Sequence, residues 1–218
     1  MQHSKSRWLA PVLLLAPLAL NIRAVDGVVL IDQNRALAGN VTPGDAAGFP
    51  VTISQAGSYR LSGNLTVPSG QSGIEISASN VTIDLNGFNI TTPVQSQVSP
   101  ARGIFFTGSG PSSITVRNGK IEGFVGPIQI FGAAPFSECL HCTYEDLVLR
   151  WGLPDATASF DSWNFTRIHN VTAPDHQIFV KCPSVVTETV ARTINVTPNF
   201  PGAPPNMGTC AFAHNATF

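Results

Sequence analysis

The sequence predicts an all-β fold, a single-stranded, right-handed parallel β-helix (a solenoid) of about seven rungs with an N-terminal cap. Three observations lead to this prediction. An Asn or Asp followed by alternating small or β-branched residues recurs along the chain. Short apolar strands lie between these landmarks, without helical periodicity. Charged residues make up only 11% of the chain, well below the roughly 25% of ordinary globular domains.

The recurring Asn or Asp defines the repeat. The landmarks are Asn64, Asn86, Asn118, Asp146, Asn170, Asn195 and Asn215, at intervals of 22, 32, 28, 24, 25 and 20 residues. Periods of this size are typical of solenoids. An Asn between two strands tolerates left-handed dihedral angles, and amides on rungs about 4.8 Å apart can hydrogen-bond to one another. We therefore expect a straight column formed by Asn86, Asn118, Asp146, Asn170 and Asn195.

A second series of short strands lies between the landmarks. Its members are Val51-Thr-Ile, Ile74-Glu-Ile, Ile104-Phe-Phe, Ile128-Gln-Ile, Ile178-Phe-Val and Cys210-Ala-Phe. Strands this short fit a coil of about 22 residues per rung, in which each strand pairs in parallel with its equivalent on the next rung. Three insertions should leave the coil as loops, at residues 91–102, 132–143 and 198–208. Residues 25–50 precede the first rung and are expected to cap the core.

The first 24 residues are predicted to be a secretory signal. A basic start with Lys5 and Arg7 precedes thirteen uncharged residues, 8–20, which are too few for a comfortable membrane span. We place the cleavage after Ala24, with an uncleaved membrane anchor as the alternative. The expected organisation is a signal peptide at 1–24, the cap at 25–50 and the β-helix at 51–218. The mature chain should be secreted or periplasmic, without a membrane span.

The mature chain is mildly acidic. Removal of residues 1–24 takes away Lys5, Arg7 and Arg23, so nine Lys and Arg remain against 13 Asp and Glu, a formal charge of −4. Proteins that bind nucleic acid carry a basic patch. The charge balance therefore argues against a nucleic-acid partner.

All four cysteines lie in the last 80 residues, at Cys139, Cys142, Cys182 and Cys210. An even number in an exported chain predicts two disulfides, with three connectivities open. One disulfide should tie down the loop around Cys139 and Cys142, and Cys182 and Cys210 could be partners on adjacent rungs. The alternative is a metal held by the Cys-Leu-His-Cys segment, but no second pair at zinc spacing accompanies it. We expect no metal and no cofactor.

Two segments resemble a known group of proteins. Residues 50–67 (PVTISQAGSYRLSGNLTV) and 73–88 (GIEISASNVTIDLNGF) look like exported bacterial right-handed β-helix repeat proteins of the pectate-lyase-like superfamily. The resemblance is good over residues 25–124 and looser beyond. It implies the fold but not a function, because this fold hosts lyases, hydrolases, epimerases and adhesins.

The motifs of the enzymes in that superfamily are missing. Glycosidic hydrolysis needs two carboxylates, one to protonate the leaving oxygen and one to activate water or attack. The sequence has no Asp-Asp pair and no Gly-His dipeptide, and its acidic residues fall mostly one to a rung. Asp84 and Arg117 could be neighbours one rung apart, and we interpret them as a surface ion pair. No catalytic residue is assigned, and the sequence leans away from an enzyme.

Aromatic and acidic residues near the loops are the candidate binding residues: Tyr144, Trp151, Asp155, Asp161 and Trp163. The aromatic rings could stack on sugars while the carboxylates accept hydrogen bonds; packing of a Trp under a loop is the alternative. The first hypothesis is non-catalytic binding of carbohydrate or a cell-surface partner. A polysaccharide lyase or glycoside hydrolase with an unrecognised site, and a structural or adhesin-like envelope module, are the alternatives.

Overall fold

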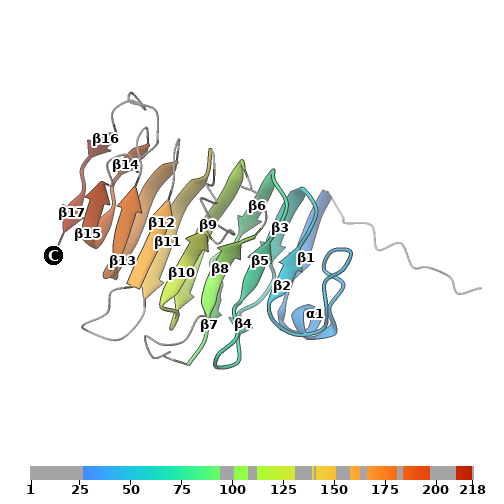
Figure 1. Cartoon of the computed structure of the whole chain (residues 1–218). Helices are drawn as coiled ribbons and strands as arrows, with labels where there is room; N and C mark the ends of the chain where they lie inside the picture. Colours follow the sequence, from blue (N-terminus) through green and yellow to red (C-terminus); the bar gives the residue numbers. More distant parts are fainter. Residues whose placement is uncertain are drawn as a thin grey trace, which may run out of the picture.

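The computed structural model describes residues 27–93, 101–107, 112–130, 139, 141–150, 158–162, 166–180, 184–196 and 210–217. It is an all-β parallel solenoid of about five turns, in which strands from successive turns lie side by side along one axis (Figure 1). The predicted coil of stacked parallel strands is confirmed.

Among the described residues, the larger of two sheets has 13 strands, and its main path runs through eight of them. These are β1 (Val28–Ile31), β3 (Gly57–Leu61), β6 (Val81–Asp84), β9 (Ile114–Glu122), β11 (Thr143–Arg150), β13 (Arg167–Val180), β14 (Val185–Thr187) and β16 (Ala211–Ala213). Neighbours on this path pair in parallel, as stacked turns require.

The remaining strands extend this sheet or form the second one. The extensions are β4 (Leu65–Thr66), β7 (Asn89–Thr91), β12 (Ala158–Ser162), β15 (Val190–Val196) and β17 (Ala216–Thr217). The second sheet contains β2 (Val51–Ile53), β5 (Ile74–Ile76), β8 (Arg102–Phe106) and β10 (Gly126–Ile130), all paired in parallel. Four of the six strands predicted as a second series therefore form a sheet of their own.

Inward-facing side chains form continuous columns because parallel pairing keeps equivalent positions in register. One column contains Tyr59, Ile83, Val116, Tyr144, Ile168 and Val186. All six residues are buried. Full burial of an aliphatic side chain contributes about 1.5–3 kcal/mol, so the alternation of apolar and polar residues along each strand suffices to fix which side faces the core.

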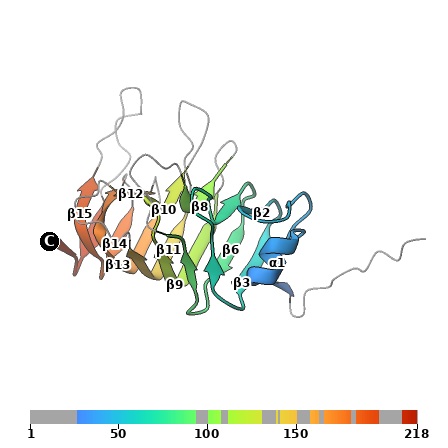
Figure 2. The same ribbon diagram turned by 90° about the horizontal axis from the view of Figure 1, so that it is seen from below.

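The chain before the second strand contains a helix that the sequence analysis did not predict. Asp32 caps α1 (Gln33–Ala38) by accepting a hydrogen bond from the backbone N of Arg35 at 2.8 Å, and Gly39 ends it. Ala36 is fully buried in the core cluster. Figures 1 and 2 both place α1 at the end of the solenoid opposite the C-terminus.

The predicted column of turn residues is largely present. Asn86, Asn118, Asp146 and Asn170 all have left-handed backbones, with φ between 50° and 59°. Strand register aligns Asn118, Asp146 and Asn170. The residues directly before and after each of them pair with the equivalent residues on the neighbouring strand. Gly87 N donates to Asn118 O at 2.7 Å, which brings the turn at Asn86 beside the same column.

Asn195 was wrongly assigned to this column. It lies on β15, opposite Phe179. The left-handed position on that turn is Glu188, with φ 51°, and His214 follows with φ 52°. His169 pairs with Thr187, and Thr187 pairs with Ala213. Glu188 and His214 directly follow Thr187 and Ala213, so they continue the column from Asn170.

Candidate binding face

A column of hydroxyl groups runs along the outer side of the larger sheet. Ser58, Thr82, Thr115 and Thr143 occupy equivalent positions on β3, β6, β9 and β11. Ser58 is exposed and the three threonines are half-buried. Within the described part of the chain, none of these four hydroxyls takes part in a hydrogen bond. Arg167 follows them on β13 and is exposed.

A column of alternating charge runs beside the hydroxyls, two residues further along each strand. It contains Arg60, Asp84, Arg117, Glu145 and His169. Arg60 Nη2 and Arg117 Nη2 lie 3.7 and 3.3 Å from Asp84 Oδ2, and Arg117 Nη1 lies 3.9 Å from Glu145 Oε1. The charges thus neutralise one another along the axis.

Asp84 is the best-connected residue of this charge column. Its side chain is only 10% exposed. Oδ1 accepts hydrogen bonds from the backbone N of Asn86 at 2.9 Å and from Asn118 Nδ2 at 3.2 Å. Buried carboxylates need such partners, because an unpaired buried charge is costly. The predicted neighbourhood of Asp84 and Arg117 is confirmed, and its partners indicate a structural ion pair.

His169 ends the charge column toward the C-terminus. Its Nδ1 lies 2.9 Å from the Thr187 hydroxyl on the next strand, and its Nε2 lies 3.8 Å from Glu188 Oε2. Both ring nitrogens of His169 therefore lie near side chains of the next turn.

A second set of ion pairs lies past the left-handed turns, on the next face of the solenoid. Lys120 Nζ lies 2.7 Å from Glu122 Oε2, and Arg150 Nη1 lies 3.7 Å from Asp175 Oδ2. Glu122 and Arg150 are opposite each other on β9 and β11. Charged residues on both faces are thus arranged to pair within the protein.

The carboxylates of the charge column stand between basic residues. The strand positions next to Asp84 hold Arg60 and Arg117, and those next to Glu145 hold Arg117 and His169. On this face of the described chain, no two carboxylates occupy neighbouring strands in the same column. The described residues likewise include no group of three His, Cys, Asp or Glu side chains placed to hold a metal ion.

The structure describes only part of the set of binding residues expected from the sequence. Tyr144 is fully buried in the core column, so its ring packs inside and we do not include it in the face. Asp161 lies on β12, opposite Phe179, and its side chain is outside the description. Trp151, Asp155 and Trp163 lie outside the described residues, and their role stays a prediction.

The hydroxyl column was missed although the sequence carries a signal for it. Ser58, Thr82, Thr115 and Thr143 each stand two residues before a charged residue, in a short strand that ends at a turn. Alternation along a strand places both residues on one face. A hydroxyl residue followed two positions later by a charged residue recurs in these strands. This recurrence predicts two adjacent columns of outward-facing side chains, one of hydroxyls and one of charged groups.

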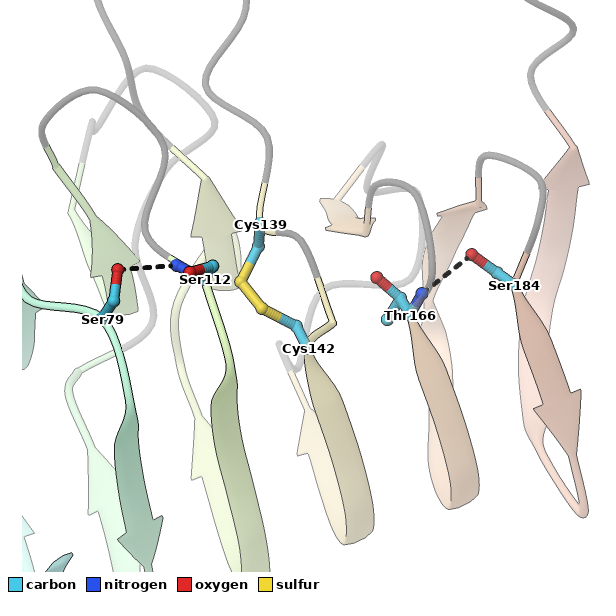
Figure 3. Close-up of a disulfide and its surroundings, with 6 residues drawn as sticks. All are labelled: Ser79, Ser112, Cys139, Cys142, Thr166 and Ser184. Atoms are coloured by element: carbon cyan, nitrogen blue, oxygen red, sulfur yellow. Dashed lines mark hydrogen bonds between the residues drawn. A yellow bond between two sulfur atoms is a disulfide. The ribbon is translucent and has the colours of Figure 1, made fainter. Parts of the chain in front are cut away.

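A disulfide joins Cys139 to Cys142 just before β11, with 5.9 Å between their Cα atoms (Figure 3). Hydroxyl side chains lie at the equivalent corner on both sides of it: Ser112 N donates to Ser79 Oγ at 3.0 Å, and Thr166 N donates to Ser184 Oγ at 3.2 Å. Disulfides persist in oxidising compartments. This bond therefore favours a location outside the cytoplasm.

Cys210 is also disulfide-bonded. Cys182 lies outside the described residues, so its expected pairing with Cys210 stays a prediction. The strand assignment behind that expectation was wrong for Cys210: the chain that follows it, β16, stacks on β14 in the larger sheet and does not belong to the second series. Shortness and an apolar pattern alone did not distinguish the two sheets.

Comparison of the chain with known protein families, curated proteins and solved structures finds no match. Within the described residues, no helix has the length and apolar character needed to cross a bilayer. The class defined by the structure is thus an all-β parallel solenoid with an ordered polar face.

Proposed function

We propose that the protein is an exported β-helix protein that binds carbohydrate, without cleaving it, on the face formed by the hydroxyl and charge columns. The observation that carries the proposal is the set of four aligned hydroxyls, Ser58, Thr82, Thr115 and Thr143, none of which is used within the described chain. Other threonines are used internally: Thr42 and Thr189 donate to backbone carbonyls.

An extended neutral polysaccharide is the ligand class that this pattern fits best. A Ser or Thr hydroxyl both donates and accepts hydrogen bonds, as a sugar hydroxyl does. Stacked strands are about 4.8 Å apart, so a linear polymer lying along the solenoid meets an equivalent hydroxyl at each step. The neighbouring charges are paired with one another. Apart from the exposed Arg167 at one end, the face therefore offers little uncompensated charge to a polyelectrolyte.

Further features of the proposal rest on the sequence and on general rules of folding. Connections between parallel strands of one sheet are almost always right-handed, which supports a right-handed coil. We propose that residues 25–50 cap the core, on the strength of the buried Ala36. We also propose removal of residues 1–24 on export, about seven rungs in the whole chain, and membership of the pectate-lyase-like superfamily, which rests on the resemblance alone.

The pairing of the acids with basic residues supports the proposed absence of cleavage. Glycosidic hydrolysis uses two carboxylates that flank the scissile bond. Asp84 and Glu145 stand two strands apart with Arg117 between them. Such a column suits a binding face, where paired charges hold the strands in place while the hydroxyls contact the ligand.

The proposal is tested on a panel of polysaccharides with two readouts, retention of the protein and appearance of new reducing or unsaturated ends. The panel contains neutral polymers (cellulose, xylan, mannan) and anionic ones (polygalacturonate, alginate), each with and without calcium. We expect retention on a neutral polymer with no new ends. Release of ends, abolished by replacing one acidic residue, would establish an enzyme instead. No retention on any polymer would reject carbohydrate binding and favour a structural role in the envelope.

A further inference from the structure

A buried histidine lies where the regular stacking of the solenoid is interrupted. His176 is on β13, between a segment whose Ala173 pairs with Ala191 and one whose Gln177 pairs with Thr193. Three residues of β13 thus face one residue of β15, and the register shifts at this point. On its other side, His176 pairs with Ala158 of β12. His176 therefore lies where β13 pairs with both β12 and β15.

The imidazole of His176 is completely buried. Its exposed fraction is 0%, and neither Nδ1 nor Nε2 has a hydrogen-bond partner in the described structure. A buried polar group without a partner is unfavourable, and a buried charge without one is far more so. The site consequently accepts the neutral ring and opposes the imidazolium.

The groups that face His176 do not reverse this preference. Burial lowers the pKa of His176 from 6.5 to about 4; the Asp175 carboxylate and the backbone of Phe124 act in the opposite direction, and the Arg150 guanidinium adds to the lowering. Asp175 is itself 3.7 Å from Arg150, so much of its negative charge is already engaged. The side chains of β12 are outside the description.

The position of β13 determines what a charge there would disturb. In a solenoid each turn contacts only its neighbours, so local disruption separates the turns on either side of it. In the larger sheet β12, β14 and β15 pair with β13, which pairs with β11. Among the described strands, β16 pairs only with β14 and β17 only with β15. Failure at β13 would release the C-terminal turns and leave the earlier ones in place.

We propose that His176 makes the C-terminal turns acid-labile: protonation of its imidazole opens the pairing of β13 with β12 and β15, while the turns from β1 to β9 stay folded. The contribution of His176 to stability is fully present above about pH 6.5, where the ring is neutral in the folded and open states alike. It is lost as the pH falls toward about 4, because the open state binds the proton first. At pH 4.5 the opening equilibrium should rise on the order of 50-fold.

Hydrogen exchange followed by mass spectrometry at pH 7 and pH 4.5 tests this directly, after correction for the intrinsic pH dependence of exchange. Peptides covering residues 184–196 should open on the order of 50-fold more at pH 4.5, whereas peptides covering 57–91 should change less than about threefold. Equal protection of 184–196 at both values of pH would overturn the proposal. So would parallel opening of 57–91, because that result means global acid unfolding.

Two variants assign the effect to this ring. His176→Phe keeps an aromatic ring that does not titrate, and the acid response of 184–196 should disappear in it. His214→Asn is the matched control: it removes an exposed imidazole at a left-handed turn that Asn tolerates, and it should respond like the wild type. An unchanged acid response in His176→Phe would refute the role of His176. If His176→Phe does not fold, His176→Gln replaces it with the same expectation.

Discussion

Asn170 donates a hydrogen bond from its Nδ2 to Oδ1 of Asp146, one turn earlier in the solenoid, at 2.7 Å. Both residues have left-handed backbones, with φ of 50° and 53°. Asn170 thus meets two requirements at once. Its backbone adopts the left-handed turn between two faces, and its side-chain amide links successive turns of the solenoid.

Replacement of Asn170 by Leu should lower the free energy of unfolding by about 1–3 kcal/mol, because it removes the hydrogen bond to Asp146 and places a branched side chain at positive φ. Asn170→Gly separates the two causes, since Gly accepts this φ and loses only the hydrogen bond. Chemical denaturation measures both. Asn89→Leu, on β7 and outside the column, should cost less, and an equal loss there would contradict the special role of the column.

Asp84→Ala should destabilise the protein by about 2–4 kcal/mol, because it leaves two arginines and two amide donors without their common acceptor. Urea unfolding at low and high salt measures the change, and the loss should persist in 1 M salt (roughly a 3 Å screening length) since the carboxylate is nearly buried. Glu122→Gln is the control. Its side chain is 42% exposed and pairs only with Lys120 among the described residues, so its effect should be within about 1 kcal/mol. Equal effects would show that Asp84 is an ordinary surface acid.

Gly119→Ala should be destabilising by about 1–3 kcal/mol or more, because a Cβ there would overlap Leu85 Cβ and lie 2.6 Å from Phe88 O. Gly119 directly follows the turn residue Asn118, and the close approach of two successive turns at this point leaves no room for a methyl group. Gly63→Ala is the matched control, with only Asp32 Cβ at 3.8 Å. Thermal unfolding compares the two, and a neutral Gly119→Ala would mean that the turns are less tightly stacked than described.

Thiol titration of the denatured, unreduced protein should find almost no free thiol, since Cys139, Cys142 and Cys210 are disulfide-bonded. Peptide mapping without reduction should recover Cys139 and Cys142 within one cross-linked fragment and Cys182 joined to Cys210. Four titratable thiols, or zinc bound in stoichiometric amount, would contradict this chemistry and the export that it supports.

The sequence predicted the features that repeat. Asn86, Asn118, Asp146 and Asn170 identified the left-handed column because Asn and Asp adopt this conformation at low cost. Asn195 was assigned to the column because Val-Thr follows it, just as Val-Thr follows Asn170. The left-handed turn is instead made by Glu188, and Glu has no preference for this backbone conformation. The length of a rung changes there, and only the pairing of strands reveals it.

Features that occur once were harder to predict. The six-residue helix α1 carries a start signal at Asp32 and a stop at Gly39, but it is too short for a helical period to be recognised. The hydroxyl column was present as Ser or Thr two residues before a charge, yet it becomes a surface only when the register of four strands is known. The burial of Tyr144 likewise depends on that register and not on the residue type.

The most direct test of the account is binding of a retained neutral polysaccharide by two triple variants. Thr82, Thr115 and Thr143 are replaced by Ala in the first; Thr66, Thr91 and Thr172, which lie on the next face, are replaced by Ala in the second. Three hydrogen bonds of about 0.5–1.5 kcal/mol each predict at least roughly tenfold weaker binding for the first variant. The second should bind like the wild type. Thermal unfolding should be cooperative in both, with a small destabilisation of the second because Thr91 Oγ1 donates to Leu65 O at 3.5 Å. Unchanged affinity in the first variant, or equal losses in both, would contradict the assignment of the binding face.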